Sequence, residues 1–181
     1  MFAIAAAITG GDVGIRDVVP EHLDAVTYKL RECGVEVLEY EDRLEVRRRR
    51  PLRATEIQAI HYPGFPTDMQ APFAVLMTQA QGTSVIHERV FENRLLYAAE
   101  VAKLGARVDV ESQVTAHVHG PVRLLGTTVA ALDLRCGIAL VLAGLAAEGT
   151  TVVEGAGHIR RGYEQLPERL VSLGAELEAV A

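Results

Sequence analysis

The feature that most constrains the fold is an internal repeat of about 70 residues. Each copy contains an apolar helix, a short strand, a second helix and further strands, and glycines punctuate these elements. The tripeptide Leu-Gly-Ala occurs at 104–106 and again at 173–175, and Cys-Gly-Val stands at 33–35. The repeat predicts an α/β domain of three pseudo-symmetric units, with helices packed inside and sheets outside. The glycines that anchor the copies are Gly11 and Gly34, Gly82 and Gly105, and Gly149 and Gly174.

Apolar spacing and turn residues locate the individual elements. Leu23, Val26, Leu30 and Cys33, for example, have the i, i+3, i+7 spacing of a buried helical stripe. We place the three copies at approximately 1–55, 56–120 and 121–181. The pattern predicts helices at 2–8, 20–33, 73–81, 95–104, 138–148 and 164–173, and strands at 12–15, 35–40, 43–46, 83–87, 106–110, 114–118, 150–153 and 175–180.

We expect the first copy to be truncated at its N-terminus. It begins with its helix at Phe2, whereas Thr67-Asp68 and Leu132-Asp133 precede the equivalent helices of the other copies. We therefore expect the first unit to lack the strand and the loop that the repeat predicts there. An uncovered sheet edge readily pairs with another chain, so a partner for this edge is expected.

Composition limits the classes of partner. Hydrophobic residues make up 49% of the chain and charged residues 23%, as in soluble globular domains. The net charge of −6 argues against a general nucleic-acid binder. The most apolar run, 138–147, is interrupted by Gly144 and followed by Glu148, so no membrane span is expected. The apolar start lacks the basic region of a signal peptide, and the two cysteines lack metal-like spacing, which together indicate a cytoplasmic protein.

One loop combines turn residues with an isolated acid. Pro63-Gly64 and Pro66 break regular structure, and Asp68 follows them at the expected start of a helix. A carboxylate there could cap the helix, because the N-terminus of a helix favours negative charge. Alternatively, Asp68 is a catalytic or ligand-binding group on a rigid loop.

Pseudo-threefold symmetry would bring equivalent loops to one end of the domain. Guanidinium groups gathered there suit a phosphate or carboxylate ligand, which they bind in a bidentate fork. An aspartate among them could act as a general base. The alternative, a set of surface ion pairs such as Glu92–Arg94 and Asp133–Arg135, stays open. The charged residues expected at this end are Asp68, Glu92, Arg94, Asp133, Arg135 and Arg161.

Other polar features give weaker hypotheses. The four arginines at 47–50 read as a solvated linker or as a contact for an acidic partner. His117 and His119 could face one side of a strand as metal ligands, but no third ligand is evident. Cys136 follows Arg135 at a helix start and reads as a core thiol or as a reactive one. We expect neither a metal nor another cofactor.

Four segments resemble the C-terminal half of the UDP-N-acetylglucosamine enolpyruvyl transferase family. They are PGFPTDMQAPF, VFENR, LDLRCGIALVLAGLAAEGTTVV and HIRRGYEQLPERLVSLGAEL. The sibling family, 5-enolpyruvylshikimate-3-phosphate synthase, resembles these loops less. The resemblance implies an inside-out α/β barrel built from three βαβαββ units, one of two such domains in the family.

The resemblance also implies a reaction and roles for residues. The reaction is the transfer of enolpyruvyl from phosphoenolpyruvate to the 3-hydroxyl of UDP-N-acetylglucosamine, with release of phosphate, at the start of peptidoglycan synthesis. Asp68 would contact the 3-hydroxyl and move protons, and Val90 would meet the nucleotide sugar through its backbone. The implied catalytic residues are Asp68, Asp133, Arg135 and Arg161, and the implied substrate-binding residues are Thr67, Asp68, Val90, Phe91, Glu92 and Arg94.

The chain also departs from the family pattern. Arg160 stands where relatives often have aspartate, and neither cysteine matches the mobile-loop cysteine of the family's other domain. That domain and the family's N-terminal strand have no counterpart here. We therefore expect half of an enzyme, with little activity alone, whose partner is the missing N-terminal domain. The alternative is a non-catalytic binding or assembly module that pairs with a separate N-terminal half or forms a homodimer; a third hypothesis is the shikimate-pathway sibling.

Overall fold

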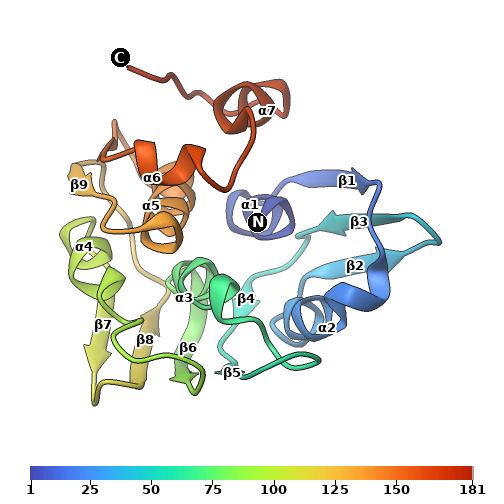
Figure 1. Ribbon diagram of the computed structural model, residues 1–181, viewed down its shortest axis with the longest axis horizontal. Helices are drawn as coiled ribbons and strands as arrows, with labels where there is room; N and C mark the ends of the chain where they lie inside the picture. The colour runs from blue at the N-terminus through green and yellow to red at the C-terminus, as the bar shows by residue number, and fades with distance from the viewer. Residues whose placement is uncertain (181) are drawn as a thin grey trace.

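Three apolar helices lie at the centre of the computed structural model, which describes residues 1–180 (Figure 1). These helices are α1 (Phe2–Thr9), α3 (Gln70–Met77) and α5 (Leu134–Ala146), and they pack directly on one another. The sheets and the remaining helices surround them. Ala181, the last residue of the third expected repeat, lies outside the described residues.

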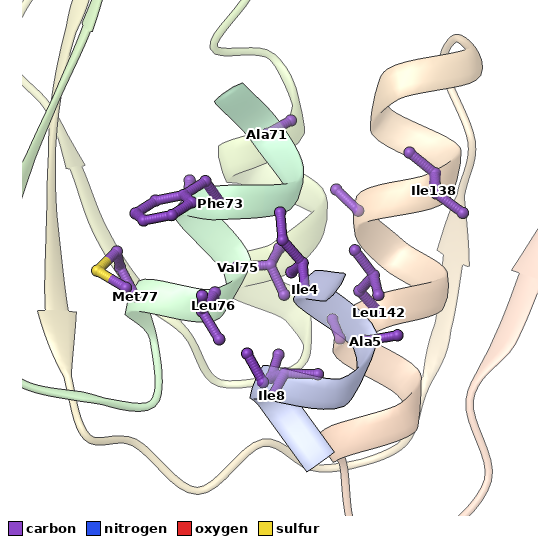
Figure 2. Packing of buried hydrophobic residues seen from close by; sticks show 14 of the residues in the cluster. Ile4, Ala5, Ile8, Ala71, Phe73, Val75, Leu76, Met77, Ile138 and Leu142 are labelled. Atoms are coloured by element: carbon purple, nitrogen blue, oxygen red, sulfur yellow. The ribbon is translucent and has the colours of Figure 1, made fainter. Parts of the chain in front are cut away.

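The central helices are buried because they are apolar on nearly every side. All residues of α3 are buried, and so is the run Cys136–Ala143 of α5. A helix of this kind needs neighbours all around it, which an interior position provides. Figure 2 shows side chains of the three helices gathered in this core, among them Ile4, Val75 and Leu142.

Shorter elements form the outer part of the domain. The remaining helices are η1 (Pro20–Leu23), α2 (Asp24–Glu32), η2 (Thr67–Met69), α4 (Tyr97–Lys103), α6 (Gly157–Arg160) and α7 (Leu166–Ser172). The strands are β1 (Asp12–Arg16), β2 (Glu36–Glu39), β3 (Arg43–Arg47), β4 (Leu52–Arg53), β5 (Glu56–Ala59), β6 (Ala80–Glu88), β7 (Arg107–Val110), β8 (Thr115–Gly120), β9 (Thr128–Ala130) and β10 (Val152–Glu154). Over residues 1–180, no helix has the length and apolar character needed to cross a membrane.

The strands form three sheets, and the two smaller sheets each repeat part of the strand order of the largest one. The largest sheet runs β5-β6-β8-β7, with β5 parallel to β6 and the other pairs antiparallel, and β4 also pairs with β6. The sheet β1-β3-β2 repeats the order β6-β8-β7, and it is antiparallel throughout. The parallel pair β9-β10 repeats β5-β6. The expected α/β fold of related units, with helices inside, is therefore confirmed, whereas the residue boundaries of the three repeats stay a prediction.

The expected end of the helix at 73–81 is wrong. The sequence predicts a helix at 73–81 that Gly82 ends, but α3 ends at Met77 and β6 begins at Ala80. Gly82 therefore lies within β6, opposite Gly120 of β8, with a φ of 111°. At Gly120 the neighbouring backbone comes so close that a Cβ atom would lie 2.4 Å from the Ala80 carbonyl oxygen. These two glycines thus serve the sheet and not the end of a helix.

The C-terminal strand expected at 175–180 is also wrong: residues 175–180 are not in a strand. Its alternating sequence suits a strand, but a strand needs a neighbour with which to exchange hydrogen bonds. The expected helix at 164–173 begins only at Leu166, because Gln165 has a left-handed φ of 48° and Pro167 stands in the first turn. The strands β4, β5 and β9 and the short helix α6 were not predicted.

Candidate functional site

Four charged residues from three separate segments of the chain meet at one end of the domain. The Asp68 Oδ1 atom accepts a hydrogen bond from Arg135 Nε at 2.7 Å and lies 4.0 Å from Arg94 Nη1. Arg135 Nη1 in turn lies 3.2 Å from Asp133 Oδ2. The structure therefore brings together two aspartates and two arginines that the repeat symmetry assigns to one end.

Asp68 does not cap a helix. It lies in η2, and Met69 occupies the N-cap position of α3 without a side-chain capping bond. The Asp68 side chain is 71% exposed, and its described polar contacts are the two guanidinium groups. The interpretation of Asp68 as a capping residue is thus wrong, and the carboxylate is available to a ligand.

Asp133 is the helix cap of this site. Its backbone is extended at the start of α5, and its Oδ1 accepts hydrogen bonds from the backbone N–H groups of Arg135 and Cys136, both at 2.8 Å. The other carboxylate oxygen pairs with the Arg135 guanidinium. Asp133 therefore fixes the start of α5 and the side chain of Arg135 together.

Arg94 is the more buried of the two arginines. Its side chain is only 14% exposed, and its guanidinium carbon lies 4.5 Å from the centre of the Phe91 ring. Stacking on an aromatic ring holds a guanidinium in a defined orientation. The Arg94 Nη1 atom donates no hydrogen bond within residues 1–180, so it retains a donor that a ligand could use.

A cavity of about 90 Å³ adjoins this cluster. Its walls come from the start of α3, from the segment that leads into α4, and from the loop before α5. Besides Arg94, the lining residues Gln70 and Tyr97 carry buried donors, Nε2 and the hydroxyl, that have no partner among the described residues. The lining residues are Thr67, Gln70, Ala71, Asn93, Arg94, Leu96, Tyr97, Leu132, Asp133, Arg135 and Cys136.

Glu88, at the end of β6, is a site residue that the sequence reasoning missed. It is only 1% exposed, and its Oε1 accepts hydrogen bonds from the backbone N–H groups of Val90 at 2.8 Å and Phe91 at 3.2 Å. Its Oε2 accepts a hydrogen bond from the Thr67 hydroxyl at 2.7 Å. Burial, together with the nearby charge of Glu88, raises the pKa of Tyr97. Thr67 and Val90, two expected binding residues, are thus connected through one carboxylate.

Two expected site residues form no ion pair with this cluster in the part of the chain that the structure describes. Glu92 and Arg161 are exposed, and within residues 1–180 neither forms an ion pair. Arg94 pairs with Asp68, so the alternative of a Glu92–Arg94 surface pair is wrong, whereas the Asp133–Arg135 pair does form.

The segment around Arg161 lies against the start of α5, because a Cβ atom at Gly162 would lie 2.7 Å from a methyl carbon of Leu134. Burial raises the pKa of Tyr163, and the charge of Asp68 raises it further. Tyr163 was not among the expected site residues; its position two residues after Arg161 is the only signal in the sequence.

The histidine pair of β8 and the thiol of Cys136 are the weaker candidates for a reactive site. Between residues 1 and 180 no three histidine, cysteine or acidic side chains are placed to hold a metal ion. His117 and His119 each contact one carboxylate, Glu111 at 3.0 Å and Asp109 at 2.8 Å. Burial raises the pKa of the Cys136 thiol, which favours the inert core cysteine over a reactive one.

Fold and site together define a class of protein. The chain is an α/β domain of related units that presents a carboxylate between arginines at one end, which suits the binding of an anionic ligand and the transfer of a proton.

Comparisons with known proteins agree with this class. The family model described as EPSP synthase (3-phosphoshikimate 1-carboxyvinyltransferase) matches residues 1–170. The chain is 50% identical over 176 residues to UDP-N-acetylglucosamine 1-carboxyvinyltransferase 3 of Caldanaerobacter subterraneus subsp. tengcongensis, covering 97% of this chain and 42% of that protein. It is 49% identical over 176 residues to a UDP-N-acetylglucosamine 1-carboxyvinyltransferase of Desulfofundulus thermocisternus, covering 97% of this chain and 72% of that protein.

Solved structures extend the likeness to the fold. The crystal structure of the enolpyruvyl transferase NikO from Streptomyces tendae superimposes with a TM-score of 0.86 at 31% identity, over 97% of this chain and 42% of that one. EPSP synthase from Acinetobacter baumannii, at 18% identity and a TM-score of 0.74 over 98% of this chain and 45% of that one, shares the fold. The chain belongs to the EPSP synthase family of enolpyruvyl transferases. It spans 42% to 43% of the length of several curated relatives that it matches.

Proposed function

We propose that this chain is one half of an enolpyruvyl transferase that acts on UDP-N-acetylglucosamine. The reaction transfers the enolpyruvyl group of phosphoenolpyruvate to the 3-hydroxyl of the sugar, releases phosphate and begins peptidoglycan synthesis in the cytoplasm. The sequence is about 50% identical to proteins named for this reaction. This similarity favours UDP-N-acetylglucosamine over shikimate 3-phosphate as the acceptor. Alone, the chain would have little activity, because it would provide only one side of the site.

The observation that carries the proposal is the Asp68 carboxylate between Arg135 and Arg94. In the reaction, the sugar oxygen bonds to C2 of phosphoenolpyruvate and a proton is added at C3; a proton then leaves C3 as phosphate departs. Asp68 can accept the hydroxyl proton as the new bond forms. The two guanidinium groups suit the carboxylate and phosphate of this substrate, whose charge they would stabilise in the transition state.

Phosphate release tests the proposal. The chain is incubated with phosphoenolpyruvate and UDP-N-acetylglucosamine, alone and with the separately produced N-terminal half of a relative, and shikimate 3-phosphate replaces the sugar nucleotide in parallel. We expect turnover only in the mixture, only with UDP-N-acetylglucosamine, and its loss in the Asp68→Asn variant. Rapid turnover by the chain alone would contradict the half-site proposal, and turnover with shikimate 3-phosphate would assign the sibling reaction.

A second candidate is a non-catalytic assembly module. Within residues 1–180, β10 pairs on one side with β9 and has no neighbour on the other, and Val152 of β10 is 49% exposed. Such an edge can be covered by a separate N-terminal half or by a second copy of the chain. Light scattering decides: a stable monomer would exclude the homodimer, and binding of an N-terminal half without turnover would favour the assembly role.

A further inference from the structure

We propose that Glu88 is a positioning residue that fixes the Asp68 loop and the Val90 loop in one geometry, an inference that rests on the function proposed above. Each of its two carboxylate oxygens binds one of these loops. The Oε2 atom binds the Thr67 hydroxyl, next to Asp68 in the chain, and Oε1 binds the backbone N–H groups of Val90 and Phe91. All of these donors belong to the loops that carry expected binding residues.

The environment of Glu88 explains why these hydrogen bonds matter. The side chain is 1% exposed, and none of the ion pairs formed by residues 1–180 includes it. A buried carboxylate without a cationic partner depends on its hydrogen bonds, since each unmet acceptor costs free energy. The three bonds of Glu88 therefore hold the loops tightly, because breaking any one of them exposes the carboxylate to this cost.

The arrangement also restricts how Val90 can meet a ligand. The Val90 N–H is occupied by Glu88, whereas no hydrogen bond reaches the Val90 carbonyl from the part of the chain that the structure describes. A ligand that contacts this backbone position must therefore offer a donor, an O–H or an N–H. UDP-N-acetylglucosamine carries both on its sugar ring, so Glu88 contributes to specificity by leaving only the acceptor of Val90 available.

Two variants of equal length separate hydrogen bonding from packing. In Glu88→Gln, one amide oxygen can still accept from Val90 and Phe91, and the amide nitrogen can donate to the Thr67 hydroxyl. Glu88→Met fills a similar volume without these hydrogen bonds. Glu111→Met is the matched control, because Glu111 is exposed and the described polar contact of its side chain is with His117 alone. Thermal unfolding establishes that each variant is folded.

The readouts are amide hydrogen exchange at Val90 and Phe91 and the affinity for UDP-N-acetylglucosamine, measured by NMR with the chain alone and with an N-terminal half. In Glu88→Met we expect exchange at both amides to accelerate about tenfold or more and affinity to fall about tenfold, as the loss of hydrogen bonds to a charged group implies. Glu88→Gln should retain both properties to within about threefold, since its hydrogen bonds persist. Thr67→Val should lower affinity while leaving exchange at Val90 and Phe91 unchanged.

Exchange at the wild-type rate in Glu88→Met would overturn the positioning role, as would equal losses of affinity in Glu88→Gln and Glu88→Met. A wild-type chain that binds no UDP-N-acetylglucosamine, even with an N-terminal half, would instead overturn the proposed function. The exchange rates would then still decide whether Glu88 holds the loops, so the two failures are distinguishable.

Discussion

Arg135 Nε lies 2.7 Å from Asp68 Oδ1, although 67 positions separate the two residues in the sequence. The Asp68 side chain is 71% exposed and the Arg135 side chain 29% exposed. Pairs in such surroundings contribute little to stability because solvent screens them. The importance of this contact is therefore not its contribution to stability but its effect on the site, where it holds the Asp68 carboxylate beside the Arg135 guanidinium.

Replacing Arg135 by glutamine should separate activity from stability. We expect Arg135→Gln to change the free energy of unfolding by less than about 1 kcal/mol. Turnover in the mixture with an N-terminal half should fall about 100-fold, because one preorganised donor to the reacting anion is lost. The measurements are urea unfolding and phosphate release.

The matched control for this change is Arg123→Gln. Arg123 forms an exposed ion pair with Glu148 outside the site, so its loss should leave turnover unchanged. Equal turnover in the Arg135→Gln variant and the wild type would contradict the assigned role of Arg135.

Asp133 has two tasks that two variants can separate. Asp133→Ala removes the side-chain cap of α5 and should lower the free energy of unfolding by about 1 kcal/mol. Asn is an equally good cap, so Asp133→Asn should restore stability but not the ion pair with Arg135. Turnover should therefore be reduced in both variants. Equal stability of Asp133→Ala and wild type in urea unfolding would show that the cap contributes nothing.

The Tyr97 hydroxyl should reduce stability in the absence of a ligand. It is buried and has no partner among the described residues, and leaving such a group unpaired costs about 1 kcal/mol or more. We expect Tyr97→Phe to raise the midpoint of thermal unfolding, whereas Tyr28→Phe, at a tyrosine that is 63% exposed, should leave it unchanged. A lower midpoint for Tyr97→Phe would mean that the hydroxyl has a stabilising partner in solution.

Much of the fold follows from the sequence because its signals are local. Apolar runs of helical length predict α1, α3 and α5, and repeat symmetry predicts that the loops of Asp68 and Asp133 meet. The expected strand at 175–180, in contrast, does not form. Alternation of apolar and polar residues describes one face of a strand, but a strand forms only where a neighbouring strand offers hydrogen-bond partners.

Glu88 could have been found in part from the sequence. Ser84, Ile86 and Glu88 occupy alternate positions of β6 and all three are buried. The period of a strand therefore places this glutamate on the inner face, where a carboxylate needs partners. Its partners, in contrast, could not be predicted, because two of the three are backbone groups whose direction depends on how the loop folds.

Cys33 predicts how stability changes at alkaline pH. Burial raises the pKa of its thiol from the ordinary value of 9.0 to about 11 in the folded protein. Between these values the unfolded chain loses the proton and the folded chain keeps it, so the unfolded state binds fewer protons and stability falls as pH rises. The contribution of the protonated Cys33 thiol to stability is fully present below pH 9 and decreases by about 1.4 kcal/mol per pH unit between pH 9 and about pH 11.

Other groups titrate in the same range, so the informative quantity is the difference in the free energy of unfolding between wild type and Cys33→Ala, measured by urea unfolding. We expect that difference to be constant from pH 7 to about 8.5 and to shrink from about pH 9 to pH 11; a constant difference throughout would show that the thiol ionises equally in both states.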